Sequence, residues 1–208
     1  MKVAIIGAGY VGSVTGAGLA ELGHQVTLVD SDAARIEAFR GGRVPIYEPG
    51  LEELVARNVA AGRLGFTSDV AGAVAGALVV FVAVGTPARQ DGEADLSAIE
   101  MVCRDVGRSL GGYCVIVEKS TVPVHTCDNI RRVINLNNPA GADYDLASNP
   151  EFLREGSALH DFFHPDRIVV GAEGKRARQV MAELYAPLVS GEYSPAAGSR
   201  YRRRHGCC

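Results

Sequence analysis

The stretch KVAIIGAGYVG, Lys2–Gly12, decides the fold. An uninterrupted apolar run leads directly into three glycines spaced G-x-G-x-x-G, from Gly7 to Gly12. The run predicts a strand buried on both faces, and the residues from Val11 to Leu22, closed by Gly23, predict a helix. This glycine spacing between a strand and a helix is typical of a turn that binds a dinucleotide.

Each glycine of the motif has a separate physical role. Gly7 allows a tight turn, Gly9 lets the backbone approach a pyrophosphate, and Gly12 lets the helix pack closely on the strand. The helix N-terminus then offers free N–H groups and a partial positive charge to the phosphates. The alternative is a glycine-rich turn that binds nothing. The flanking strand and helix, with an acidic residue 18 positions after Gly12, favour the dinucleotide.

That acidic residue, Asp30, ends the next expected strand. A carboxylate there accepts hydrogen bonds from the adenosine ribose and repels a 2′-phosphate, which favours NAD over NADP. Arg35 follows five residues later. It could stack on adenine, contact a phosphate, or be a solvated helix residue, and the sequence leaves these alternatives open.

The rest of the chain alternates short apolar runs with longer amphipathic segments. This pattern predicts an α/β fold, a doubly wound parallel sheet of the Rossmann type, over residues 1–188. Residues 189–208 read as an irregular basic tail. The expected strands are Lys2–Gly9, Gln25–Asp30, Leu64–Asp69, Ala77–Val84, Tyr113–Ser120, Tyr144–Pro150 and Arg167–Glu173.

Composition narrows the class of protein. Of the 208 residues, 47% are apolar and the net charge is −3, so nothing favours nucleic acid or an anionic membrane as a partner. No apolar run reaches transmembrane length. The five cysteines are scattered, which fits a reduced, cytoplasmic location. No metal site is expected, because His125, His160 and His164 are not arranged as ligands.

Polar residues follow three of the expected strands. Thr86 follows the first, Ser120 and Thr121 follow the second, and Glu151 follows the third. Parallel strands end at one edge of a sheet, where ligands of such folds bind, so one cleft is predicted. Taken singly, these residues could be caps or turn elements. A short helix is expected between Pro150 and Leu159, which would place Glu151 and Glu155 on one face.

Several longer motifs occur in a specific order between Met1 and about Leu188. They are GAGYVG, the VD pair at 29–30, PIYEPGLEELV, FVAVGTP, EKSTVPV and NPEFLREGSALHDFFHPDRIVVG. Together they resemble the N-terminal part of the nucleotide-sugar dehydrogenases, the UDP-glucose/GDP-mannose dehydrogenase family. The closing PDRIVVG is more similar to members acting on UDP-glucose than to those acting on GDP-mannose.

The resemblance implies NAD as cofactor and the oxidation of UDP-glucose, or a related nucleotide sugar, to the uronate. It implies catalytic roles for Thr121, which orders a water, Glu151, which helps hydrolyse a thioester, and Glu155, near the nicotinamide. It implies that the residues binding NAD are Gly7, Gly9, Tyr10, Val11, Gly12, Asp30, Arg35, Thr86, Thr121 and Glu155. It implies that the residues contacting the substrate are Glu151, Phe152, Leu153 and Glu155.

The family pattern ends near Leu188. The central helix with its Lys and Asn, and the UDP-binding domain with the nucleophilic Cys, have no match, and Cys207 and Cys208 do not fit that loop. We therefore expect an NAD-binding half that is inactive alone, and a homodimer for a full-length form. The alternatives are a GDP-mannose or UDP-N-acetyl-mannosamine dehydrogenase fragment, or a non-catalytic NAD-binding module.

Overall fold

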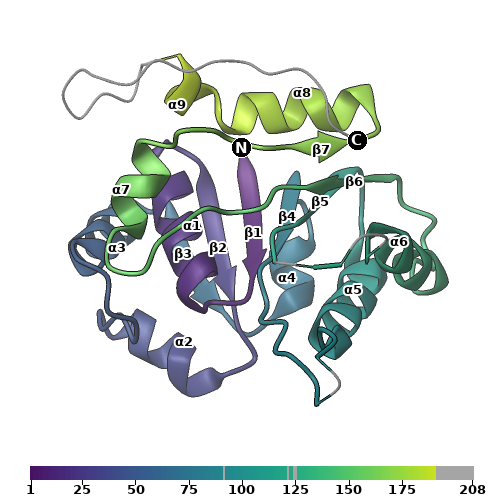
Figure 1. The fold of residues 1–208 in the computed structure, drawn as a ribbon, viewed down its shortest axis with the longest axis horizontal. Coiled ribbons are helices and arrows are strands. Elements are labelled where there is room, and N and C mark those ends of the chain that lie inside the picture. The colour runs from purple at the N-terminus through teal and green to yellow at the C-terminus, as the bar shows by residue number, and fades with distance from the viewer. Residues whose placement is uncertain (91, 121, 124–125, 191–208) are drawn as a thin grey trace.

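A seven-stranded sheet forms the centre of the computed structural model, which describes residues 1–90, 92–120, 122–123 and 126–190 (Figure 1). The strand order is β3-β2-β1-β4-β5-β6-β7. All neighbouring strands pair in parallel except β6 with β7. The doubly wound α/β fold is therefore confirmed. The strands are β1 (Lys2–Ile6), β2 (Gln25–Val29), β3 (Leu64–Thr67), β4 (Val79–Val82), β5 (Cys114–Glu118), β6 (Tyr144–Ser148) and β7 (Gly171–Ala172).

Helices cover both faces of this sheet. One face packs against α1, α2, α3, α7 and α8, and the other against α4, α5 and α6. The helices are α1 (Tyr10–Glu21), α2 (Ala33–Arg40), α3 (Leu51–Ala60), α4 (Val70–Val74), α5 (Ser97–Ser109), α6 (Thr126–Leu136), α7 (Ala158–Phe163), α8 (Lys175–Leu184) and α9 (Ala186–Val189). Among the described residues, no helix has the length and apolar character needed to cross a membrane.

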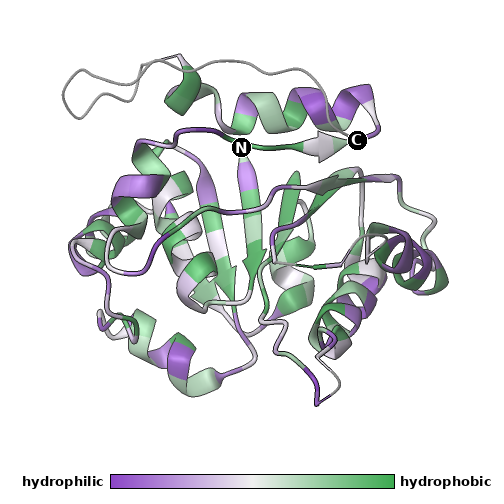
Figure 2. Cartoon of the chain, viewed as in Figure 1, coloured by the Kyte–Doolittle hydropathy of each residue, from purple (hydrophilic) through white to green (hydrophobic). Residues whose placement is uncertain are grey.

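Successive strand residues enter opposite cores. In β1, Ile5 packs on the α1 side and Ile6 on the α5 side; in β4, Phe81 and Val80 divide in the same way. A strand that is buried on both faces needs apolar residues at every position, which explains the unbroken runs in the sequence. Figure 2 shows the hydrophobic colour concentrated in these central strands.

The expected helix directly after Pro150 is wrong. Residues 151–154 have no regular structure, residues 155–157 form a turn, and α7 begins only at Ala158. The Glu151 carboxylate accepts a hydrogen bond from the Leu153 N–H, a local bond that competes with helix formation. Gly156 has φ +83°, a conformation outside the right-handed helix. Glu151 and Glu155 therefore do not share a helical face.

The last expected strand is also shorter and differently oriented. Only Gly171–Ala172 pairs with the sheet, and it runs antiparallel to β6. The Val169 carbonyl instead accepts a hydrogen bond from the Asn149 side-chain amide, at 2.7 Å. In Figure 1 the segment after β6 crosses in front of β1 to reach α7, and the chain then returns to β7. This crossing brings residues 149–157 to the edge where the parallel strands end.

Candidate functional site

The glycine turn after β1 has the geometry of an anion-binding loop. A Cβ on Gly7 would stand 2.4 Å from the Ala83 carbonyl oxygen, and one on Gly12 would stand 1.8 Å from the Gly7 carbonyl oxygen. A Cβ on Gly9 would meet nothing within 4 Å. Gly9 is also the N-cap of α1 and makes no side-chain cap, so the first-turn N–H groups have no partner within the helix. The turn therefore has open space and donors for a phosphate.

Asp30 lies at the end of β2 and is nearly buried. It accepts hydrogen bonds from the Ala8 N–H at 2.8 Å, the Asp32 N–H at 2.9 Å and the Arg35 guanidinium at 2.9 Å. Burial alone would raise the pKa of Asp30, but these three donors together hold it below the ordinary value. The carboxylate is thus ionised and fixed beside the glycine turn.

The structure settles one alternative for Arg35. Its side chain is about one-third exposed and forms an ion pair with Asp30, so it is more than a solvated helix residue. This ion pair places the positive charge of Arg35 next to the carboxylate that would contact the adenosine ribose. The repulsion between Asp30 and a 2′-phosphate is therefore partly offset.

A cavity of about 260 Å³ opens where the carboxyl ends of β1, β4, β5 and β6 meet. This is the point where the strand order reverses between β1 and β4, the usual ligand position in open α/β sheets. The Ser120 hydroxyl donates to the Val84 carbonyl at 2.7 Å and joins two of the loops. The cavity is lined by Gly9, Tyr10, Val11, Ala83, Val84, Gly85, Thr86, Lys119, Ser120 and Glu151.

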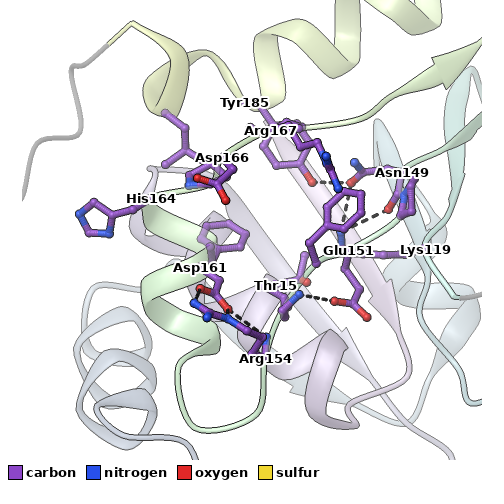
Figure 3. Close-up of a pocket in the computed structure, with 17 residues that line it drawn as sticks. Thr15, Lys119, Asn149, Glu151, Arg154, Asp161, His164, Asp166, Arg167 and Tyr185 are labelled. Atoms are coloured by element: carbon purple, nitrogen blue, oxygen red, sulfur yellow. Dashed lines mark hydrogen bonds and ion pairs between the residues drawn. The ribbon is translucent and has the colours of Figure 1, made fainter. Parts of the chain in front are cut away.

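A larger cavity of about 390 Å³ lies next to it, under the segment that follows β6 (Figure 3). Glu151, Phe152 and Leu153 line it. Arg167 also lines this cavity, and its guanidinium lies over the Phe152 ring, 4.6 Å from the ring centre. Lys119 and Glu151 line both cavities, so these two side chains form a shared wall.

Lys119 is a residue that the sequence analysis missed. It is buried, and its Nζ lies 3.2 Å from the Asn149 Oδ1, which also accepts the Tyr185 hydroxyl at 2.6 Å. Burial lowers the pKa of Lys119 to about 8, although the charge of Glu151 opposes the shift. The available signal was the pair of charged residues, Glu118 and Lys119, that directly follows the apolar run YCVIV. The amine thus lies between the two cavities with a weakened hold on its proton.

The remaining expected site residues differ in position. Glu155 is exposed and belongs to the described lining of neither cavity, although its charge acts on Tyr10 and so places it nearby. Phe152 is about half exposed at the larger cavity. Thr121 lies outside the described residues, as do residues 191–208 of the expected tail.

The glycine turn, the acidic residue after β2 and the cavity at the reversal of strand order define a dinucleotide-binding domain of the dehydrogenase type. Residues 1–189 match the model of the UDP-glucose/GDP-mannose dehydrogenase family, NAD binding domain. The chain belongs to this family, and its cofactor is NAD.

Relatives support this assignment along most of the chain. It is 55% identical over 191 residues to a UDP-glucose 6-dehydrogenase of Rhizobium meliloti (strain 1021), a match that covers 90% of this chain and 44% of that protein. A solved UDP-glucose dehydrogenase from the archaeon Pyrobaculum islandicum superposes with TM-score 0.86 and 45% identity, covering 89% of this chain and 44% of that one. A GDP-mannose dehydrogenase from Pseudomonas aeruginosa gives 0.86 and 36%, with the same coverage. The chain thus spans less than half the length of these relatives.

Proposed function

We propose that this chain is the NAD-binding half of an enzyme that oxidises the C6 alcohol of UDP-glucose to the carboxylate of UDP-glucuronate. The observation that carries the proposal is the shared wall of Lys119 and Glu151 between the cavity at the glycine turn and the larger cavity. Bound NAD supplies the hydride acceptor. A nucleotide sugar in the larger cavity would face it across these two side chains.

The residues proposed to hold NAD fit it chemically. The α1 amides and the open space at Gly9 suit the pyrophosphate, and Asp30 suits the adenosine ribose. Thr86 lines the cavity at the glycine turn, where the nicotinamide end would lie. The full set proposed for the cofactor is Gly7, Gly9, Tyr10, Val11, Gly12, Asp30, Arg35, Thr86, Thr121 and Glu155.

Glu151 is the proposed base for the hydrolytic step. A carboxylate at the shared wall can take a proton from a water that attacks a thioester. Thr121 and Glu155 are proposed to help order that water, and Phe152 and Leu153 to contact the substrate. Each of these roles remains a prediction.

The cysteines of the described residues do not suit a nucleophile. Cys103 and Cys114 are buried in the core on the α5 side, and burial raises the pKa of each thiol to about 12. A thiol with such a pKa supplies almost no thiolate near neutral pH. Cys127 is partly buried, and burial raises the pKa of its thiol as well. We therefore propose that this chain binds NAD but does not complete the oxidation alone.

UDP-glucose is favoured over other nucleotide sugars by relative identity. The solved UDP-glucose dehydrogenase is 45% identical, the GDP-mannose enzyme 36%, and a UDP-D-ManNAc dehydrogenase from Pyrococcus horikoshii 25%. A non-catalytic NAD-binding module is the alternative from another class. Homodimerisation of a full-length form stays a prediction.

Calorimetric titration with NAD, followed by an assay of NADH formation with UDP-glucose, tests the proposal. We expect NAD binding that is weakened in Asp30→Ala, and no turnover by this chain. Restoring the rest of a family member's sequence after residue 189 should give turnover with UDP-glucose in preference to GDP-mannose. Absence of NAD binding would overturn the proposal, and turnover by the chain alone would overturn its incomplete-site part.

A further inference from the structure

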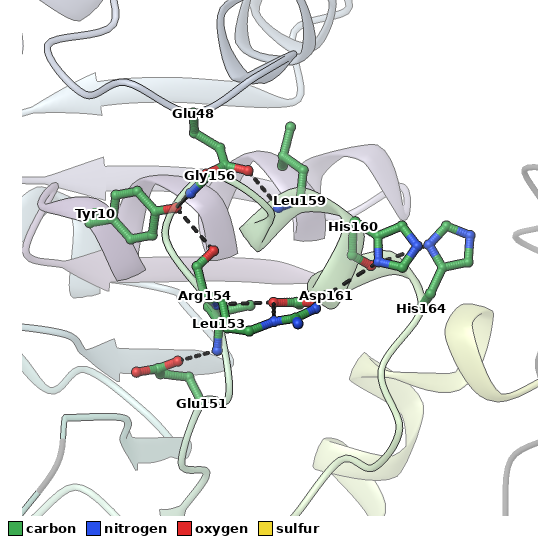
Figure 4. Close-up of polar contacts among 10 residues, drawn as sticks. All are labelled: Tyr10, Glu48, Glu151, Leu153, Arg154, Gly156, Leu159, His160, Asp161 and His164. Atoms are coloured by element: carbon green, nitrogen blue, oxygen red, sulfur yellow. Dashed lines mark hydrogen bonds and ion pairs between the residues drawn. The ribbon is translucent and has the colours of Figure 1, made fainter.

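Glu48 is a buried carboxylate in the loop between α2 and α3, with 6% of its surface exposed. One of its oxygens accepts hydrogen bonds from the Tyr10 hydroxyl and from the Gly156 N–H, the latter at 2.9 Å. The other oxygen accepts the Leu159 N–H at 3.2 Å. Figure 4 shows the carboxylate between these partners, which are far apart in the sequence.

The three partners belong to two functional segments. Tyr10 lies within the glycine motif and is the first residue of α1. Gly156 and Leu159 belong to the turn after Glu151 and to the first turn of α7. The Ser157 N-cap of α7 makes no side-chain cap, so Glu48 supplies the acceptor that a local cap would otherwise supply. One carboxylate thus joins the cofactor turn to the segment that carries Glu151.

Tyr10 completes the bridge from the other side. Its hydroxyl accepts the Gly156 N–H at 3.1 Å and lies 3.4 Å from the Arg154 carbonyl. Burial and the hydrogen bond to Glu48 raise the pKa of Tyr10 to about 12, so the phenol remains a donor near neutral pH. Its ring position is set by the glycine motif, since Tyr10 directly follows Gly9.

Among the described residues, the other polar contacts of this segment are made within it or to residues that follow it in the chain. The Arg154 guanidinium pairs with Asp161 of α7 at 2.6 Å, and the Glu151 carboxylate bonds to the Leu153 N–H. These bonds shape the segment but do not fix it relative to the glycine turn. That connection is made by Glu48 together with Tyr10.

We propose that Glu48 is a positioning residue, which fixes the segment 151–157 against the glycine turn so that Glu151 is held at the wall shared by the two cavities. The inference rests on the proposed function for the identity of the ligands. The bridge itself requires no ligand, so the two can fail separately.

Residue-resolved hydrogen exchange of this chain without ligand tests the bridge. In Glu48→Gln the size is kept, but one acceptor oxygen becomes an NH₂ donor that faces backbone N–H groups. We expect the Gly156 and Leu159 amides to exchange at least about tenfold faster. Glu53→Gln, an exposed residue in the first turn of α3, is the matched control and should leave both amides unchanged.

Tyr10→Phe provides a milder second variant. It should accelerate exchange at Gly156 by about threefold and leave Leu159 nearly unchanged, because only the Gly156 N–H contacts the phenol. If Glu48→Gln fails to fold, the Gly156 amide in Tyr10→Phe decides the question. Exchange equal to the unmodified chain at that amide would overturn the proposal.

NAD titration of the same variants separates positioning from general stability. We expect each single variant to weaken NAD binding about two- to fivefold, and the double variant to bind no more weakly than Glu48→Gln, because both changes break one bridge. NAD binding by Glu48→Gln that is as tight as in the unmodified chain would overturn the positioning role. If the unmodified chain binds no NAD, the proposed function fails, while the exchange result still decides whether the bridge exists.

Discussion

Gly12 lies directly against the carbonyl of Gly7: a Cβ at residue 12 would stand 1.8 Å from that oxygen. The oxygen that would clash belongs to the backbone of the same tight turn, so it cannot move aside without opening that turn. The close approach of helix α1 to strand β1 therefore depends on glycine at this position. The middle glycine of the motif, Gly9, has no such constraint. The effects of replacing Gly12 and Gly9 can therefore be distinguished by experiment.

Gly12→Ala is expected to lower the free energy of unfolding by about 3 kcal/mol or more, because overpacking a turn forces the backbone to shift. Gly9→Ala should change it by less than about 1 kcal/mol, since its Cβ would meet nothing within 4 Å. The same Cβ would occupy the space proposed for the pyrophosphate, so NAD binding should fall at least about tenfold. Urea unfolding and NAD titration measure the two effects. Equal destabilisation by the two variants would contradict this division of roles.

Asp30→Ala is expected to weaken NAD binding by about tenfold, because a charged acceptor for the ribose is lost. It should also release Arg35, which pairs with Asp30 at 2.9 Å, so the preference for NAD over NADP should shrink. The measurement is the ratio of the two dissociation constants. The double variant Asp30→Ala with Arg35→Ala is the control. If the double variant shows the same reduced preference for NAD over NADP as Asp30→Ala, the explanation through Arg35 is wrong.

Glu118, at the end of β5, should make stability depend on pH. Burial raises its pKa to about 7 from an ordinary 4.5, and within the described residues its Oε1 has no hydrogen-bond partner. Between these two pH values the unfolded chain has released the proton while the folded chain still holds it. The contribution of Glu118 to stability therefore falls as pH rises from about 4.5 to 7.

Glu118→Gln removes this titration. We expect its stability gain over the unmodified chain to grow between pH 5 and pH 8, to roughly 1–3 kcal/mol. Urea unfolding at several pH values provides the measurement. Comparing the two proteins at each pH cancels the titration of all other groups. A difference that stays constant with pH would exclude this residue as the cause.

Tyr185→Phe tests how the end of α8 is attached to the site. The Tyr185 hydroxyl donates to the Asn149 Oδ1 in the interior, at 2.6 Å. Its loss should cost about 1 kcal/mol, because Lys119 still donates to the same oxygen. Tyr144→Phe is the matched control: its hydroxyl bonds to Asn135 at an exposed position, at 2.7 Å, and should cost less. A larger loss in the control than in Tyr185→Phe would reverse this interpretation.

The central strands could be predicted from the sequence because a strand that is buried on both faces is an unbroken apolar run. The expected strand Ala77–Val84 contains β4, Val79–Val82, and the glycine motif lies between β1 and α1 as expected. The position of Asp30 beside the glycine turn follows from the same pattern. These features depend on neighbours in sequence or on the alternation of strands and helices.

The parts that could not be predicted depend on distant partners. Glu48 bonds to Gly156, 108 residues later, and no periodicity in the sequence reports such a contact. The segment after Pro150 has residues that suit a helix, but the Glu151 side chain bonds to its own backbone at Leu153 instead. The antiparallel β7 likewise arises because the chain must return across the sheet from α7. Spacing alone therefore placed Glu151 correctly at the strand edge and gave it the wrong local conformation.

The wall formed by Lys119 and Glu151 has a thermodynamic consequence. The same two side chains line both cavities. A ligand that fills one cavity and shifts either side chain therefore changes the affinity of the other cavity for its own ligand. Such coupling is reciprocal: if NAD strengthens the binding of a sugar by some factor, the sugar strengthens the binding of NAD by that factor. The protonation of Lys119 belongs to the same cycle, so filling either cavity should be accompanied by a change in the number of bound protons.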